Sequence, residues 1–261
     1  MSIAVGAAMQ AGRVIMESYG KVLQVDAKQH HDFVTDVDRR SEEMIIRYIQ
    51  RAFPKHEILA EESGQDKNVD ACRWIIDPLD GTTNFIHGIP MFAVSIALEV
   101  EGELRAGVVY EPVRKELFTA EKSKGAFLNN RKISVSSTTD KSRCLLATGF
   151  PFRNYELLDD YLKIFKSFMM QTSGVRRPGS AALDLCYLAC GRFDGFWELN
   201  LKPWDIAGGS LIISEAGGQV TNFAGYGDFL YKGNVIGSNS VIHPWMLETV
   251  RDVLLDKVKL L

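Results

Sequence analysis

The chain has 261 residues, of which 46% are hydrophobic and 24% charged, a composition typical of globular proteins that excludes a predominantly disordered chain. Its 30 Lys and Arg residues and 33 Asp and Glu residues give a net charge of −3, which does not support bulk electrostatic binding to nucleic acid or to anionic lipid. The longest nearly unbroken apolar stretch, residues 91–98, is far shorter than the ~18 residues of a membrane span, and no basic segment precedes Arg13. We therefore expect a cytoplasmic protein without membrane association.

The N-terminal half of the chain carries the patterns of two helices followed by several strands. Apolar spacing predicts a helix over residues 3–19 and a second helix that begins after Thr35, carries Asp38 in its first turn and ends near Pro54. Short apolar runs predict strands at residues 57–60, 74–76, 93–100, 104–110 and 116–120, the last three as an antiparallel meander.

The C-terminal half alternates helices and strands in a different pattern. Residues 136–143 contain no apolar side chain, so we place a boundary there and divide the chain into residues 1–138 and 139–261. In the second part, the patterns predict an α/β layer with helices at 155–170, 180–190 and 205–216 and strands at 174–176 and 193–197.

Candidate chemistry concentrates where the strand at residues 74–76 ends. Asp77 and Asp80 follow this strand three residues apart, Pro78 is expected to stop its hydrogen-bonded ladder, and Gly81 permits close approach of a ligand to the backbone. Two carboxylates and an intervening carbonyl suit Mg²⁺, and a helix that starts near Thr82 would direct its free amides to a phosphate. The segment therefore predicts a combined metal and phosphate site.

A simpler interpretation is that Asp-Pro-x-Asp-Gly forms an ordinary turn, because these residue types are the ones that turns prefer. Adjacent acids such as Glu61 and Glu62 are usually solvated, and an acid that opens a helix, such as Asp205, is usually a cap. Several such sites in one chain favour the functional interpretation.

Three strings in the chain, AEESG (60–64), WIIDPLDGTTNF (74–85) and PWDIAGGSLIISEAGG (203–218), resemble the signatures of the inositol monophosphatase family, within the lithium-sensitive Mg²⁺-dependent sugar phosphatases. The segments VRRPGSAALDL (175–185) and DGFWE (194–198) are most similar to bacterial inositol-1-monophosphatases. With the predicted elements, the resemblance implies an α+β / α/β fold, a layered αβαβα sandwich with an antiparallel-sheet N-terminal half packed on a smaller α/β C-terminal half.

The resemblance also implies the roles of the acidic residues. It implies that the metal ligands are the side chains of Glu61, Asp77, Asp80 and Asp205 and the backbone carbonyl of Leu79. Asp77 would lie between two ions. Asp38 would work with Thr82 to orient the attacking water, while Asp36 and Glu62 would have supporting roles. Carboxylates gathered in one cleft need cations to offset their repulsion, so we expect Mg²⁺ to bind before a phosphate.

The substrate contacts implied by the resemblance fall in two groups. Leu79, Asp80, Gly81, Thr82 and Asp205 would surround the phosphate, whereas contacts to the rest of the substrate would come from Arg176, Gly179, Ser180, Ala181 and Glu198. Arg176 could equally lie at a solvated strand end or in an interface. Glu198 would accept hydrogen bonds from sugar hydroxyls.

The expected function is Mg²⁺-dependent hydrolysis of inositol 1-phosphate or a similar polyol phosphate, with lithium sensitivity. A fructose-1,6-bisphosphatase or a broader sugar-phosphate phosphatase is the nearest enzymatic alternative, because related members share the metal site. An alternative of another class is a binding partner of the transcription machinery, which the intact acid set argues against as the sole role. We expect a phosphate ester as ligand and a homodimer.

Overall fold

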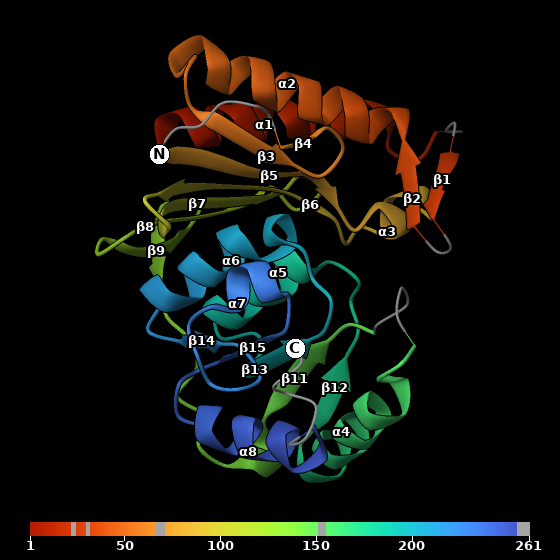
Figure 1. Cartoon of the computed structure of the whole chain (residues 1–261), viewed down its shortest axis with the longest axis vertical. Helices are drawn as coiled ribbons and strands as arrows, with labels where there is room; N and C mark the ends of the chain where they lie inside the picture. The colour runs from red at the N-terminus through yellow and green to blue at the C-terminus, as the bar shows by residue number, and fades with distance from the viewer. Residues whose placement is uncertain (22–24, 30–31, 66–70, 151–154, 255–261) are drawn as a thin grey trace.

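The structure, a computed structural model, describes residues 1–21, 25–29, 32–65, 71–150 and 155–254. Helices and sheets alternate in layers along the long axis of the molecule (Figure 1). A pair of helices lies at one end, followed by a large sheet, a second helix pair, a smaller sheet and a final helix pair. This arrangement confirms the predicted αβαβα sandwich.

The large sheet belongs to the N-terminal half of the chain. Its strands are β3 (Glu57–Ala60), β4 (Gly64–Gln65), β5 (Cys72–Asp80), β6 (Ala93–Val100), β7 (Glu103–Glu111), β8 (Glu116–Glu121), β9 (Gly125–Leu128) and β10 (Arg131–Ile133). They lie in the order β10-β9-β8-β7-β6-β5-β3-β4, and neighbouring strands are antiparallel except for β3 and β5, which are parallel. β5 and β6 are almost continuously apolar and buried, because helices cover both faces of the sheet.

The helices α1 (Ser2–Ser18) and α2 (Asp36–Ala52) cover the outer face of this sheet (Figure 1). On α1 the buried side chains are mostly alanines with Ile15 at the end of the stripe, and such small residues let the helix lie close to its neighbours. A hairpin of β1 (Val25–Gln29) and β2 (Asp32–Thr35) leads directly into α2 and fixes where this helix begins.

The middle layer consists of α5 (Ala181–Ala189) and α6 (Pro203–Glu215), which lie between the two sheets (Figure 1). Every residue of α5 is buried, and α6 is buried from Ile206 to Ile213. Helices that are apolar on all sides are typical of positions with packing partners all around.

The smaller sheet and its outer helices complete the molecule. The strands are β11 (Leu145–Thr148), β12 (Gly174–Arg176), β13 (Gly195–Glu198), β14 (Gln219–Thr221) and β15 (Val235–Ser238), in the order β12-β11-β13-β15-β14. β11 is parallel to β12 and β13, and the other pairs are antiparallel. The remaining helices are α3 (Thr82–Ile86), α4 (Leu158–Gln171), α7 (Phe229–Lys232), α8 (His243–Leu254) and the 3₁₀ turn η1 (Lys141–Arg143). No helix in the described ranges is long and apolar enough to span a membrane.

One expectation about β5 is wrong. Pro78 was expected to end the ladder, but β5 continues to Asp80, which again pairs with β6 at Ala93. The register shifts between Asp77 and Asp80, so Pro78 lies in a bulge. A residue in a bulge need not donate a ladder hydrogen bond, so the absence of an N–H on proline is tolerated there. The bulge brings both carboxylates to the end of one strand.

The division at residue 138 stays a prediction. One hydrophobic cluster includes Ile75 and Val109 of the large sheet together with Leu185 and Ile212 of the middle helices, so a common core crosses the proposed boundary. The segment that follows β10 is attached to the C-terminal half, because the N–H of Val135 donates a hydrogen bond of 3.1 Å to the carbonyl of Ala216.

Candidate active site

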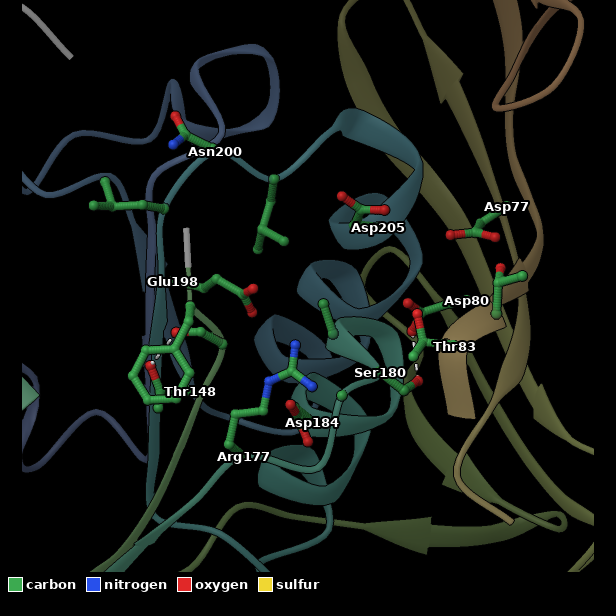
Figure 2. Close-up of a pocket in the computed structure, with 18 of the residues that line it drawn as sticks. Asp77, Asp80, Thr83, Thr148, Arg177, Ser180, Asp184, Glu198, Asn200 and Asp205 are labelled. Carbon is green, nitrogen blue, oxygen red and sulfur yellow. Dashed lines mark hydrogen bonds between the residues drawn. The ribbon is translucent and has the colours of Figure 1, made fainter. Parts of the chain in front are cut away.

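A cleft of about 470 Å³ lies between the end of β5 on one side and the ends of β11 and β13 on the other (Figure 2). The starts of α5 and α6 form its floor. Most of the residues singled out in the sequence line it, namely Glu61, Asp77, Leu79, Asp80, Gly81, Thr82, Gly179, Ser180, Ala181, Glu198 and Asp205. The fold thus gathers into one cavity residues that lie up to 144 positions apart in the sequence, from Glu61 to Asp205.

Three carboxylates converge at one end of the cleft. Asp77 and Asp80 come from β5 and Asp205 from the first turn of α6, and one oxygen of each lies within 4.8 Å of the others. The backbone N–H of Lys202 donates a hydrogen bond of 2.6 Å to Asp205 Oδ2, which orients this side chain at the helix start. Oxygen ligands at such spacing are the set that a hard divalent cation prefers.

The pKa values of these acids reflect burial and mutual repulsion. Burial and the negative charges of Glu61, Asp80 and Asp205 raise the pKa of Asp77 well above its ordinary value. Burial also raises the pKa of Asp80 to about 6, although hydrogen bonds from Ser180 and Ala182 oppose the shift. A bound cation would relieve this repulsion, so the residues present fit a divalent metal ion.

Glu61 and Leu79 line the cleft but lie outside the cluster of three carboxylates. Glu61 lines the same cleft and its charge acts on Asp77 and Asp80, but its carboxylate is not a member of the cluster of three. The carbonyl oxygen of Leu79 accepts a hydrogen bond of 3.0 Å from Thr82 Oγ1. Their roles as metal ligands stay predictions.

Asp38 and Thr82 form the expected pair. Thr82 Oγ1 lies 2.9 Å from Asp38 Oδ1, although Asp38 is fully buried and reaches the cleft only through this threonine. Asp38 Oδ2 accepts hydrogen bonds from Thr35 Oγ1 at 2.5 Å and from the Thr35 N–H at 2.8 Å. Burial raises the pKa of Asp38, while the bonds from Thr35 and Thr82 lower it. Thr35 was predicted as the cap of this helix, and the Thr-x-x-Asp spacing of a capping box could also have revealed that it holds Asp38.

The helix start predicted after β5 is present. α3 begins at Thr82, its N-terminal cap is Gly81, and both line the cleft together with Thr83. Gly81 has φ +90°, and a Cβ there would lie 2.8 Å from the Met91 carbonyl oxygen, so both the backbone conformation and the space require glycine. The first amides of a helix have no intrahelical acceptor and are available to an anion.

Residues of the C-terminal half hold the end of β5 in place. Asp80 Oδ2 accepts hydrogen bonds from Ser180 Oγ at 2.5 Å and from the Ala182 N–H at 2.8 Å. Ser180 therefore orients a carboxylate of the cluster. Asn84 on α3, for which the sequence predicted no contact, donates a hydrogen bond from Nδ2 to the carbonyl of Pro178 at 2.9 Å.

The far wall of the cleft differs from the prediction at one arginine. Arg176 is exposed and donates to the carbonyl of Val175, whereas Arg177 lines the cleft beside Glu198 (Figure 2). Adjacent residues at a strand end point in opposite directions, which explains why only one of the pair faces the cleft. Asp184 also lines this wall and was missed, although its position four residues after Ser180 places both on one face of a helix.

Asp36 and Glu62, the two residues predicted to support the site, do not line the cleft. Asp36 lies at the start of α2, about half exposed and 4.0 Å from Arg40. The turn that contains Glu62 is held by Glu42, whose carboxylate accepts the N–H of Glu62 at 2.8 Å and of Ser63 at 2.9 Å. Glu42 is therefore a supporting residue that the sequence did not reveal.

Comparison with known proteins agrees with this geometry. The model of the family described as "Inositol monophosphatase family" matches residues 1–255. The chain belongs to the inositol monophosphatase family. Family membership supports a phosphatase, which agrees with a cleft that combines clustered carboxylates and a helix start.

Individual members of the inositol monophosphatase family resemble the chain over nearly its whole length. The Nus factor SuhB of Pseudomonas aeruginosa is 45% identical, covering 99% of this chain and 98% of that protein. The extragenic suppressor protein SuhB of Bartonella henselae has a crystal structure with a TM-score of 0.93 at 46% identity, covering 96% of this chain and 98% of that one. An inositol monophosphatase from Anabaena has a TM-score of 0.85 at 38% identity, covering 97% and 95%.

Proposed function

We propose that the protein is a Mg²⁺-dependent phosphomonoesterase that hydrolyses inositol 1-phosphate to inositol and phosphate. The observation that carries the proposal is the cluster of Asp77, Asp80 and Asp205 in the same cleft as the Asp38–Thr82 pair and the start of α3. These are the parts that metal-assisted hydrolysis of a phosphate ester requires.

Asp77, Asp80 and Asp205 would hold Mg²⁺, with Glu61 and the carbonyl of Leu79 as further candidate ligands. When bound, the cation would offset the clustered negative charge and make a water molecule at the site more acidic. The bonds from Ser180 to Asp80 and from the Lys202 amide to Asp205 would keep two of these carboxylates oriented.

Asp38 and Thr82 would prepare the water that attacks phosphorus. Thr82 Oγ1 lies within hydrogen-bond distance of Asp38 and of the Leu79 carbonyl, and when it donates to Asp38 its lone pairs would be available to a water in the cleft. Thr82 would pass its own proton to Asp38 Oδ1 as it takes a proton from the water, and the two bonds from Thr35 would hold the other carboxylate oxygen in place. The amides of Gly81 and Thr82 would bind the phosphate oxygens.

The opposite wall supports a leaving group with hydroxyls and no second phosphate. Glu198 and Asp184 place two carboxylates there, with Arg177 as the nearby cation (Figure 2). Carboxylates accept hydrogen bonds from hydroxyls but repel a phosphate dianion. This charge distribution favours a polyol monophosphate over fructose 1,6-bisphosphate.

The test is phosphate release from a panel of esters with and without Mg²⁺. Inositol 1-phosphate, fructose 1,6-bisphosphate and glycerol 2-phosphate are compared at equal concentration, with Asp252→Asn as a matched control at an exposed acid outside the cleft. We expect the highest kcat/KM for inositol 1-phosphate and no turnover after chelation of Mg²⁺. Preference for the bisphosphate would contradict the proposed substrate, and metal-independent turnover would contradict the proposed chemistry.

Lithium sensitivity is proposed from the family resemblance. Li⁺ that enters the metal site after cleavage would retain phosphate, so inhibition should be uncompetitive with the ester. Steady-state kinetics at several fixed Li⁺ concentrations and saturating Mg²⁺ provide the measurement. A rise in KM with unchanged kcat would show that Li⁺ acts before cleavage and would contradict this placement.

A second candidate function is binding to the transcription machinery, because several curated relatives are named Nus factors. A pull-down with RNA polymerase should recover the protein, and recovery of Asp77→Asn at the same level would show that binding does not need catalysis.

We also propose a homodimer, supported by the exposed apolar side chains Leu162, Met169 and Met170 on α4. Light scattering would give the mass in solution. The cytoplasmic location stays a prediction.

A further inference from the structure

Gly149, which follows the last residue of β11, lies in the wall of the cleft directly against Glu198. A Cβ built on Gly149 would be 1.8 Å from Glu198 Oε1 and 2.1 Å from its Cδ. Unlike Gly81 at φ +90° and Gly179 at φ +92°, Gly149 does not have a left-handed backbone. Glycine at residue 149 is therefore not explained by a left-handed backbone, and the space beside Glu198 is what requires it.

The backbone that carries Glu198 has little freedom to move away. The carbonyl of Trp197 accepts hydrogen bonds from Thr148 Oγ1 at 2.7 Å and from Tyr161 Oη at 3.1 Å. Thr148 is paired in parallel register with Trp197, and Glu198 pairs with Val235 on β15. Strands β11, β13 and β15 are thus fixed relative to one another around this point.

A methyl group at residue 149 would consequently displace the end of the Glu198 side chain and leave the strand in place. The carboxylate is the far end of a flexible side chain and faces the open cleft (Figure 2), so rotation of its torsions is the least costly response. The substitution should change the site more than the stability of the fold.

We propose that Gly149 is a positioning residue that determines substrate specificity by leaving the space in which the Glu198 carboxylate meets the hydroxyls of the leaving group. This inference rests on the proposed function, in which Glu198 accepts hydrogen bonds from a polyol. Thr148 and Tyr161 assist by holding the Trp197 carbonyl, one residue before Glu198.

The experiment compares Gly149→Ala with wild type on inositol 1-phosphate and on phenyl phosphate, whose leaving group has no further hydroxyl. We expect kcat/KM for inositol 1-phosphate to fall roughly 10- to 100-fold, the effect of losing hydrogen bonds to a charged group, with phenyl phosphate changed less than about 3-fold. Gly227→Ala adds the same methyl group where nothing lies within 4 Å, and it should leave both substrates unaffected.

A double-mutant cycle with Glu198→Ala separates positioning from a general structural effect. If Gly149 acts through Glu198, adding Gly149→Ala to Glu198→Ala should cause no further loss on inositol 1-phosphate. Equal losses on both substrates, or additive losses in the double variant, would overturn the proposal.

A crystal structure of Gly149→Ala tests the geometry independently of turnover. A rotated Glu198 side chain with β13 unmoved is expected, and an unmoved carboxylate would overturn the inference. Absence of polyol phosphate hydrolysis by wild type would instead contradict the proposed function, so the two failures are distinguishable.

Discussion

Asp77 is 1% exposed, and burial together with neighbouring acids raises its pKa well above the ordinary value. The Leu79 N–H, which donates to Asp77 Oδ1 at 3.0 Å, opposes this shift by lowering the pKa of Asp77. Burial and three neighbouring acids disfavour its ionised form, so without a cation this side chain destabilises the fold at neutral pH. A residue that costs stability and is surrounded by oxygen ligands is typical of a functional site.

The substitution Asp77→Asn separates the effect of Asp77 on stability from its contribution to catalysis. It keeps the size of the side chain and removes one negative charge, so turnover should fall at least ~100-fold, a barrier increase of about 2.7 kcal/mol. Metal-free Asp77→Asn should melt no lower than metal-free wild type, because the repulsion is smaller, and Mg²⁺ should raise its Tm less. Calorimetry and phosphate release measure the two effects. Retention of more than about a tenth of wild-type kcat would contradict a central role for Asp77.

His243 provides a residue-scale prediction away from the cleft. Its ring is buried between Ser238 Oγ at 2.8 Å from Nδ1 and Thr221 Oγ1 at 2.9 Å from Nε2, and burial lowers its pKa to about 4. Between about pH 6.5, the ordinary value, and pH 4, the unfolded chain binds a proton that the folded chain does not. The contribution of His243 to stability is therefore complete above about pH 6.5 and is lost as the pH falls to 4.

The measurement is urea denaturation of wild type and His243→Gln from pH 8 to pH 4. Buried acids such as Asp77 titrate with the opposite sign, so the difference between the two proteins isolates the histidine. We expect the free energy of unfolding of wild type, relative to the variant, to decrease by at most about 1.4 kcal/mol per pH unit in this window. An NMR titration of the His243 ring with a midpoint near 6.5 would contradict the prediction.

At the scale of elements, the sequence predicted those with long apolar periodicity. α1, α2 and the strands β6 to β8 lie within a few residues of the predicted ranges, because amphipathic stripes and alternation are local properties. Of the short strands, β3, β12 and β13 were predicted, whereas β9, β10, β11, β14 and β15 were not, since runs of three or four residues acquire much of their pairing from partners elsewhere in the chain.

The residues of the candidate site also divide into those that were predicted from local sequence and those that were not. Asp77, Asp80 and Gly81 were predictable because one contiguous segment carries the bulge, the ligands and the helix start. Arg177 and Asp184 were not, because their approach to the cleft depends on how β12 and α5 are oriented after folding. Glu42 was also missed, since its bonds to the turn at Glu62 span 20 positions of the chain.

The N-terminus of α2 links the stability of an element to catalysis. Thr35 caps this helix by accepting the amides of Val37 and Asp38, and its own hydroxyl and amide hold Asp38. Thr35→Ala should lower the free energy of unfolding by about 1–2 kcal/mol through loss of the cap, and should also lower kcat because Asp38 Oδ2 loses a donor. Thr35→Ser keeps the hydroxyl and is the matched control. Chemical denaturation and steady-state kinetics decide the matter, and an Ala variant with the kcat of the Ser variant would show that Asp38 needs no support from this side chain.

At the scale of the whole molecule, contacts between the two halves hold the walls of the cleft relative to each other. Tyr231 of α7 donates a hydrogen bond of 2.7 Å to Glu99 of β6 and accepts one of 2.8 Å from Arg73 of β5. On the other side of α6, Gly107 of β7 and Gly208 of α6 bring two backbones into contact. Since Asp205 lies in the first turn of α6, we expect this packing to affect the distance between Asp205 and the carboxylates of β5.

The contact at Gly107 is therefore expected to control both stability and metal affinity. A Cβ on Gly107 would lie 2.8 Å from the carbonyl oxygen and 3.3 Å from the Cα of Gly208, which are backbone atoms that cannot rotate away. Gly107→Ala should push α6 from the sheet, lower the free energy of unfolding by about 1–3 kcal/mol, and weaken Mg²⁺ binding because Asp205 moves with the helix.

Gly227→Ala is the matched control for Gly107→Ala, because the added methyl group at residue 227 meets no atom within 4 Å. Chemical denaturation gives the stability of each variant, and titration calorimetry gives its Mg²⁺ affinity. A loss of stability with unchanged Mg²⁺ affinity would show that the metal cluster tolerates a shift of α6, and that Asp205 is held by its local bond to the Lys202 amide. Loss of both, with Gly227→Ala like wild type, would establish that packing between the halves sets the geometry of the metal site.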